Sequence, residues 1–249
     1  MENIKSSETS ELNELISKYS PFLIEIRKRI LVTLSVFAVA ALGGFIFYEI
    51  IIRFLIDILS LKGINIVFTS PFQFINLAIN CGFTLGLVLV FPLLIYQILS
   101  FLRPALKAKE YKMLARSLPF SIILFLTGFL LGFLVMKWQI QIFLAKSISL
   151  GIGNVLDISH LLSTVLMTSA LMGIGFQFPI VMLLLMRIGI IEHHQLSKQR
   201  NWVYLGAFIF TILLPADSIL ADVLLALPFV IMFEFTLILD NIFERRNIA

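Results

Sequence analysis

Six apolar segments, separated by polar and charged residues, follow one another between Ile30 and Leu239. They are Ile30–Tyr48, Phe74–Phe101, Leu118–Met136, Leu161–Ile191, Trp202–Leu214 and Ile219–Leu239. A helix rises 1.5 Å per residue and the hydrocarbon core of a bilayer is about 30 Å thick, so about 20 apolar residues cross it. The pattern therefore predicts an all-α integral membrane protein with six transmembrane helices.

The fourth and fifth segments depart from a simple span. Pro179 interrupts the fourth, because proline lacks the N–H that a helix interior uses. The fifth segment would form a helix only about 20 Å long, so it must thin the membrane or lean on its neighbours. Trp202 and Tyr204 are typical of an interface anchor at one end, and Pro215 ends the segment at the other. We expect a concave bundle with short fifth and sixth spans, joined by a tight turn at 215–218.

The two ends of the chain are polar. Residues 1–29 have mixed charge and lack the pattern of a cleavable signal peptide. Apolar residues recur at i, i+3, i+4 and i+7 from Leu12 to Tyr19, which indicates a short amphipathic helix before Pro21. The predicted organisation is an N-terminal segment at 1–29, a six-span domain at 30–240 and a C-terminal tail at 241–249.

Lysine and arginine predict the orientation, because they accumulate on the cytosolic side of membrane proteins. With six spans, 15 of the 19 basic residues share the side of the two termini, and Arg53, Lys62, Lys137 and Lys146 lie on the other. The 15 are Lys5, Lys18, Arg27, Lys28, Arg29, Arg103, Lys107, Lys109, Lys112, Arg116, Arg187, Lys198, Arg200, Arg245 and Arg246. Both termini are therefore predicted in the cytosol.

Composition agrees with a membrane protein and narrows the function. Hydrophobic residues make up 59% of the chain and charged residues 14%, whereas soluble domains carry about 25% charged residues. Cys81 is the single cysteine, so no disulfide can form within the chain. The sequence has no glycine-rich phosphate loop, no cysteine and histidine cluster with metal spacing and no Gly-x-Ser-x-Gly. We expect no catalytic residues, cofactor or metal, which leaves transport, assembly or receptor work.

Short motifs occur in a fixed order along the six segments. They are Leu23-Ile24-Glu25-Ile26-Arg27-Lys28-Arg29, Ser70-Pro71-Phe72, the run from Pro92 through Tyr96-Gln97, Phe101 and Pro104-Ala105-Leu106 to Glu110, Gly175-Phe176-Gln177-Phe178-Pro179, Gly206-Ala207-Phe208, Leu214-Pro215-Ala216-Asp217, Ala226-Leu227-Pro228 and Phe233-Glu234. Each motif alone is weak, but together they resemble the TatC family, the multispanning core of the twin-arginine protein translocase. The resemblance covers about Leu23 to Phe243.

The resemblance implies a receptor for folded cargo proteins whose signal peptides carry paired arginines. It places the recognition surface on Glu25, Arg27 and Glu110, with Phe101 beside Glu110. Carboxylates suit the task, because the planar guanidinium donates two parallel N–H bonds that lysine cannot match. Two other interpretations stay open: Glu25 pairs with Arg29 at i, i+4, and Glu110 neutralises its neighbouring lysines.

The resemblance also implies partners and an energy source. It implies the single-span proteins TatA and TatB, a homo-oligomeric receptor complex, and a drive from the proton-motive force in a bacterial cytoplasmic membrane. An organelle membrane stays open as the alternative. Family members often carry Glu where this chain has Gln177, His where it has Phe22 and an aromatic residue where it has Leu99.

Polar groups inside spans and at the outer turns complete the candidate residues. Gln177 and Glu234 lie within predicted spans, where polar side chains mark function or hydrogen bonds between helices. Pro71, Phe72 and Asp217 lie at outer turns, and Asp217 is placed to cap the sixth helix.

Two other classes remain as alternatives. A small-solute transporter would show several facing charges in its spans or repeated halves, and a membrane protease would need a catalytic constellation within them.

Overall fold

The computed structural model describes residues 2–59, 61, 65–67, 70–103, 108–151, 155–187, 191, 194, 198–216 and 218–248. Within these ranges, it does not describe the side chains of residues 2–19, 21, 22, 65, 66, 102, 108–110, 112–117, 155, 184, 187 and 239–248.

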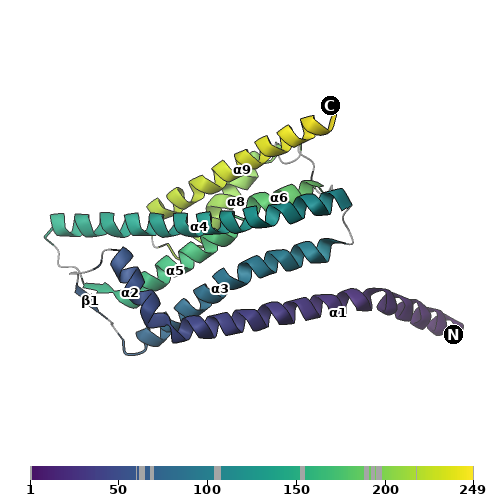
Figure 1. The fold of residues 1–249 in the computed structure, drawn as a ribbon, viewed down its shortest axis with the longest axis horizontal. Coiled ribbons are helices and arrows are strands. Elements are labelled where there is room, and N and C mark those ends of the chain that lie inside the picture. Colours follow the sequence, from purple (N-terminus) through teal and green to yellow (C-terminus); the bar gives the residue numbers. More distant parts are fainter. Residues whose placement is uncertain are drawn as a thin grey trace.

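Helices dominate the described residues. In chain order the elements are α1 (Glu2–Ile46), α2 (Tyr48–Ile58), β1 (Asn65–Val67), α3 (Gln73–Leu102), α4 (Ala108–Ser149), β2 (Val155–Asp157), α5 (Ile158–Gly175), α6 (Phe178–Arg187), α8 (Arg200–Ile212) and α9 (Ile219–Ile248). The chain ends lie toward the same end of the bundle, and α2 and β1 lie at the opposite end (Figure 1). We call these the terminal end and the far end.

Five described helices are long and apolar enough to cross a membrane. Their candidate spans are Leu23–Ile46, Gln73–Phe101, Leu118–Ser149, Ile158–Leu183 and Ile219–Ile238. These coincide with five of the six predicted segments, which confirms a membrane protein built mostly of helices. The predicted short fifth segment corresponds to α8, whose 13 residues are too few for this criterion.

The fourth segment is interrupted as predicted. Its helix ends at Gly175 and a new one starts at Phe178, so the break lies at Phe176–Gln177, just before Pro179. The helix of the sixth segment, α9, has 30 residues, but its candidate span, Ile219–Ile238, has 20 and is the shortest of the five.

Three further features differ from the sequence-based expectation. The first helix does not stop before Pro21 but runs from Glu2 to Ile46, since one proline removes one hydrogen bond while neighbouring turns stay paired. An additional helix, α2, follows the first span. Finally, β1 and β2 form a small parallel pair, with Asn65 opposite Val155 and Val67 opposite Asp157, so the fold is not purely helical.

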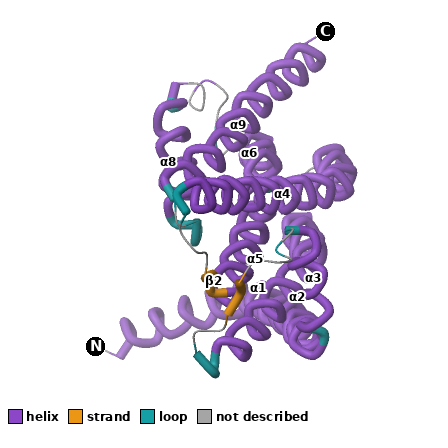
Figure 2. The backbone as a smooth tube through the Cα atoms, turned by 90° about the vertical axis from the view of Figure 1, so that its left-hand side faces the viewer, coloured by secondary structure: helices purple, strands orange, loops and turns teal. Residues whose placement is uncertain are grey.

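The centre of the bundle is α5, and α1 lies at its edge. In the most apolar stretch of Ile158–Leu183, 61% of residues are buried, against 6% in Leu23–Ile46. The helices α1, α2 and α3 lie on one side of α4, and α6, α8 and α9 lie on the other (Figure 2). The main helical neighbour of α1 is α3.

Glycines allow the helices to approach closely. Gly82 and Gly86 lie one turn apart on α3, and a Cβ at Gly82 would lie 2.6 Å from the carbonyl oxygen of Ala41 on α1. On α4, a Cβ at Gly128 would lie 2.8 Å from the carbonyl oxygen of Met172 on α5. Small residues spaced by four positions are typical of helix packing in membranes, where van der Waals contact replaces the hydrophobic effect.

Candidate functional site

Glu25 lies on α1 and forms an ion pair with Arg29, one helical turn along. The Nη2 and Nε of Arg29 donate to the same carboxylate oxygen, Oε1, at 2.5 and 3.1 Å. The side chain of Glu25 is 47% exposed and that of Arg29 is 23% exposed. The i, i+4 pair that the sequence left open is therefore formed, and the pair leaves half of the Glu25 side chain accessible.

Arg29 also connects α1 to α3. Its Nη1 donates to the backbone carbonyl of Gln97 at 2.8 Å, and its Nη2 donates to Oγ of Ser100 at 3.1 Å. One turn further along α1, Thr33 donates its hydroxyl to Oε1 of Gln97 at 2.8 Å. Because α3 ends at Leu102, the guanidinium lies at its C-terminal turns, where the helix dipole favours a positive charge. We call these four side chains, Arg29, Thr33, Gln97 and Ser100, the α1–α3 clamp.

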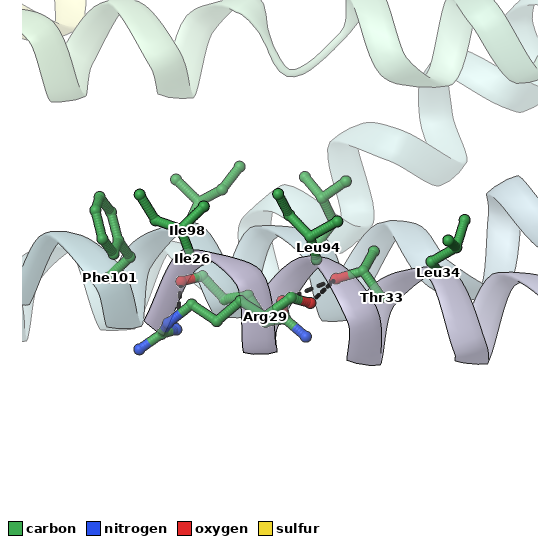
Figure 3. A pocket seen from close by; sticks show the side chains of 9 residues that line it. Ile26, Arg29, Thr33, Leu34, Leu94, Ile98 and Phe101 are labelled. Carbon is green, nitrogen blue, oxygen red and sulfur yellow. Dashed lines mark hydrogen bonds between the residues drawn. The ribbon is translucent and has the colours of Figure 1, made fainter. Parts of the chain in front are cut away.

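An apolar groove runs beside the clamp. It has a volume of about 580 Å³ and is lined by Ile26, Arg29, Ile30, Thr33, Leu34, Leu94, Gln97, Ile98 and Phe101. Figure 3 shows Phe101 and Ile98 rising from α3 on one side and Arg29 and Thr33 on α1. Phe101 therefore shares this groove with Ile26 and Arg29, which lie next to Glu25 and one helical turn from it.

The structure describes the other predicted site residues in less detail. Arg27 is exposed on α1, and none of the described residues bonds to it. Glu110 lies in the first turn of α4, and its side chain lies outside the described residues. Pro71 and Phe72 are exposed in the turn before α3, at the far end and away from Glu25. Asp217 lies outside the described residues.

Gln177 is buried and bonded inside the chain. Oγ of Ser121 on α4 donates to its Oε1 at 2.6 Å, and its Nε2 donates to the Ser121 carbonyl oxygen at 3.0 Å. Gln177 sits at the break between α5 and α6, so the amide ties this irregular backbone to α4. The predicted hydrogen bond to a neighbouring helix is present, and its partner is Ser121.

Glu234 is paired across two helices. On α8, Tyr204 donates its hydroxyl to Oε1 of Glu234, and Nη1 of Arg200 lies 3.4 Å from Oε2. The carboxylate therefore bonds α9 to the short helix α8, as expected for a charge within a span. A second apolar groove of about 520 Å³ lies nearby, between α3, α5, α6, α8 and α9, and Gln177, Phe178, Gly206 and Phe229 are among its lining residues.

Sequence reasoning missed a polar cluster at the far end. Asp157 caps α5 by accepting from the backbone N–H of His160 at 3.1 Å, and it accepts from Nε2 of Gln73 at 2.6 Å. A capping aspartate ahead of an apolar run was a usable signal for this helix start. The start of α9 is capped by Ser218, whose Oγ accepts from Ala221 N–H at 3.2 Å.

The described residues offer no metal site, because no group of three or more His, Cys, Asp or Glu side chains comes together among them. Sequence reasoning also assigned no role to Gln97, Ser100 and Thr33. A signal was present in Thr33, which follows Arg29 by four residues and so shares its helix face.

Comparison with known proteins identifies the family. The family model described as "Sec-independent protein translocase protein (TatC)" matches residues 21–228. The TatCy protein of Bacillus subtilis is 27% identical over 230 residues, covering 90% of this chain and 89% of that protein. The TatC protein of Escherichia coli K12 is 30% identical over 216 residues, covering 85% of this chain and 83% of that protein.

A solved structure supports the same conclusion. The crystal structure described as "Twin Arginine Translocase Receptor- TatC in DDM" superposes with a TM-score of 0.78 at 26% identity, covering 87% of this chain and 98% of that one. Sequence and fold agree over the same region, and the chain belongs to the TatC family of Sec-independent protein translocase proteins.

Proposed function

We propose that this chain is the receptor and core subunit of a twin-arginine translocase, which binds twin-arginine signal peptides and organises the export of folded proteins. As a TatC-family membrane protein it is a translocase component, a transport role rather than a catalytic one. The observation that carries the proposal is the half-exposed Glu25, bonded to a guanidinium beside an apolar groove.

The chemistry of Glu25 supports arginine recognition. The carboxylate already accepts two N–H bonds from Arg29, both on Oε1. Among the described residues, nothing bonds to its other oxygen. A signal-peptide guanidinium can bond there, and charge-assisted bonds of this kind are about twice as strong as neutral ones.

Glu110 is proposed as the second carboxylate. It lies in the first turn of α4, only a short connection after the end of α3 that carries Phe101. Lys107, Lys109 and Lys112 surround it in sequence, so general attraction does not recruit an arginine pair and specific bonds are required. Arg27, exposed on α1, is proposed to orient this surface or fix the topology.

The groove suits the apolar part of the signal peptide. Of its nine lining residues, only Arg29, Thr33 and Gln97 are polar, and these three already bond to one another. A signal peptide that places its arginines at Glu25 can lay its apolar residues against Ile26, Ile98 and Phe101.

We propose six spans with both termini in the cytosol, α8 being the short fifth. The support is that both termini lie at one end of the bundle (Figure 1). In this topology the sequence assigns 15 of the 19 basic residues to the side of the termini. The membrane is proposed to be the bacterial cytoplasmic membrane, with the proton-motive force as drive.

The flank formed by α8 and α9 is proposed to dock TatA-type and TatB-type single-span partners. Gln177 and Glu234 are bonded within the chain, so we propose that they support docking by holding α6 and α8 in place. Pro71, Phe72 and Asp217 are proposed to act at the outer face, and several copies are proposed to assemble into the receptor complex.

The test is photo-crosslinking of a signal peptide to the protein in membranes. It compares Arg-Arg and Lys-Lys peptides on wild type, Glu25→Gln, Glu110→Gln and the control Glu49→Gln, which removes an exposed carboxylate of α2 at the far end. We expect Arg-Arg crosslinks to wild type and the control, and a loss of about tenfold for Lys-Lys peptides and for either of the first two variants, the size of one charge-assisted hydrogen bond. Equal crosslinking of both peptides to wild type would refute the proposal.

A further inference from the structure

We propose that Arg29 is a positioning residue that sets the preference for arginine over lysine, by fixing Glu25 to the last turns of α3. The inference rests on the proposed function, since it assigns a role beside the carboxylate that receives the signal peptide. Arg29 itself touches no cargo in this scheme and acts through Glu25.

The donors of Arg29 are almost fully used. A guanidinium has five N–H groups in a fixed planar fork. Four bonds are formed: Nε and Nη2 to Glu25, Nη2 to Ser100 and Nη1 to the Gln97 carbonyl. Two helices are thus held by one planar group, and lysine, with a single nitrogen, cannot reach all three partners in this geometry.

Glu25 depends on this arrangement for a fixed position. It lies on α1, of which only 6% of the most apolar stretch is buried, and its side chain is 47% exposed. Glutamate loses considerable rotamer freedom when ordered, so an exposed carboxylate on an edge helix would otherwise move. The bonds of Arg29 to Gln97 and Ser100 tie the carboxylate to α3, the helix that carries Phe101.

The selectivity follows from geometry and charge together. Two N–H groups of Arg29 converge on Oε1 and fill both its acceptor positions, so an incoming cation meets mainly Oε2. A fixed acceptor favours the rigid guanidinium fork. A lysine ammonium is a hydrated point charge, so its binding depends more on the net charge of the acceptor site. The pairing with Arg29 offsets the charge of Glu25 and therefore weakens lysine binding.

Removing Arg29 therefore affects the two kinds of signal peptide differently. Glu25 becomes mobile, which weakens the geometric fit of arginine, and it carries an unpaired negative charge, which attracts lysine. Both changes reduce the ratio of the Lys-Lys to the Arg-Arg dissociation constant. A purely structural role of Arg29 would weaken both peptides alike and leave the ratio unchanged.

The experiment measures binding of fluorescent Arg-Arg and Lys-Lys signal peptides to the full-length protein in lipid nanodiscs. The variants are Arg29→Gln, Arg29→Lys and the matched control Lys28→Gln, which removes an exposed neighbouring charge without touching the α1–α3 clamp. We expect Arg29→Gln to lower the ratio of the Lys-Lys to the Arg-Arg dissociation constant about tenfold, which corresponds to the free energy of one charge-assisted hydrogen bond. Arg29→Lys should give an intermediate ratio, and Lys28→Gln the wild-type ratio.

The outcomes separate the inference from the proposed function. An unchanged ratio in Arg29→Gln, or an equal fall in Lys28→Gln, overturns the positioning role while leaving the receptor assignment intact. A wild-type protein without preference for Arg-Arg, or full binding by Glu25→Gln, overturns the proposed function itself. If Arg29→Gln does not fold, Arg29→Lys provides the test. The inference requires its ratio of the Lys-Lys to the Arg-Arg dissociation constant to be lower than that of wild type.

Discussion

Two adjacent glycines in α1 allow a matched test of the contact between α1 and α3. A Cβ added at Gly44 would lie 2.8 Å from the Cα of Gly82 and 2.9 Å from the Cβ of Leu85, whereas a Cβ added at Gly43 would meet nothing within 4 Å. The two replacements, Gly44→Ala and Gly43→Ala, are the same chemical change one residue apart in one helix. We expect the first to destabilise the protein and the second to be neutral or stabilising.

The magnitude follows from the structure. Ordinary contact begins at 3.4 Å, so α3 must withdraw from Gly44→Ala by about 0.6 Å (3.4 − 2.8). A gap of 0.5–1 Å costs a contact a quarter to half of its attraction, and overpacking costs about 1–3 kcal/mol. Replacing glycine by alanine inside a helix gains about 0.5–1 kcal/mol through the backbone, and this gain is common to both variants. Their free energies of unfolding should therefore differ by about 1–3 kcal/mol.

The assay is unfolding of the purified protein in mixed detergent micelles, followed by circular dichroism. Signal-peptide binding by the same samples shows whether loosening α1 at Gly44 reaches Glu25 at the other end of the candidate span. If both variants unfold at the same detergent fraction as wild type, α1 and α3 are not in the close contact described. If Gly43→Ala is the less stable variant, the assignment of the two faces of α1 is wrong.

Three further predictions concern side-chain bonds within the bundle. Replacing both partners of the buried pair, Ser121→Ala and Gln177→Leu, should show a coupling energy of about 0.6–1.7 kcal/mol in a double-mutant cycle of unfolding, the range for bonds between membrane helices; additive single effects would contradict the pair. Asp157→Ala should destabilise the protein by about 1 kcal/mol through loss of the cap on α5, while Asp157→Asn retains most of the stability, as thermal unfolding can show. Tyr204→Phe should leave Glu234 bonded to α8 only through Arg200 and increase proteolytic cleavage near the ends of α8, whereas unchanged cleavage would mean that the hydroxyl does not hold this helix.

The span pattern could be predicted from the sequence because the bilayer imposes a simple length rule. Runs of about 20 apolar residues correspond to α3, α4 and α9, and Pro179 predicted the break that separates α5 from α6. The rule does not predict α2 or the β1–β2 pair, because their 11 and three residues are too few to cross a bilayer. Three-residue strands carry no periodicity of their own, and their pairing depends on which loops the spans bring together.

The candidate site was predictable only in part. The motif around Glu25 and Arg29 suggested their ion pair, because i, i+4 pairs follow from helix geometry alone. The bonds of Arg29 to Gln97 and Ser100 join residues about seventy positions apart, and nothing in the sequence encodes this register directly. Gln177 shows the same limit: a hydrogen bond to another helix was expected, but Ser121 was not identifiable as its partner.

The contact between α1 and α3 depends on specific packing more than a soluble helix pair would. Lipid is as apolar as the exposed leucines and isoleucines of α1, so burying them against α3 gains no hydrophobic free energy. Two local features contribute to the attachment: close backbone approach at Gly44 and Gly82, and the polar α1–α3 clamp toward the terminal end. The first is short-ranged, so a displacement of less than 1 Å weakens it, while the second is directional and tolerates only small rotations. Glu25 lies beside the α1–α3 clamp. The part of α1 near Gly44 can therefore shift without moving the carboxylate, and Arg29 governs the position of Glu25.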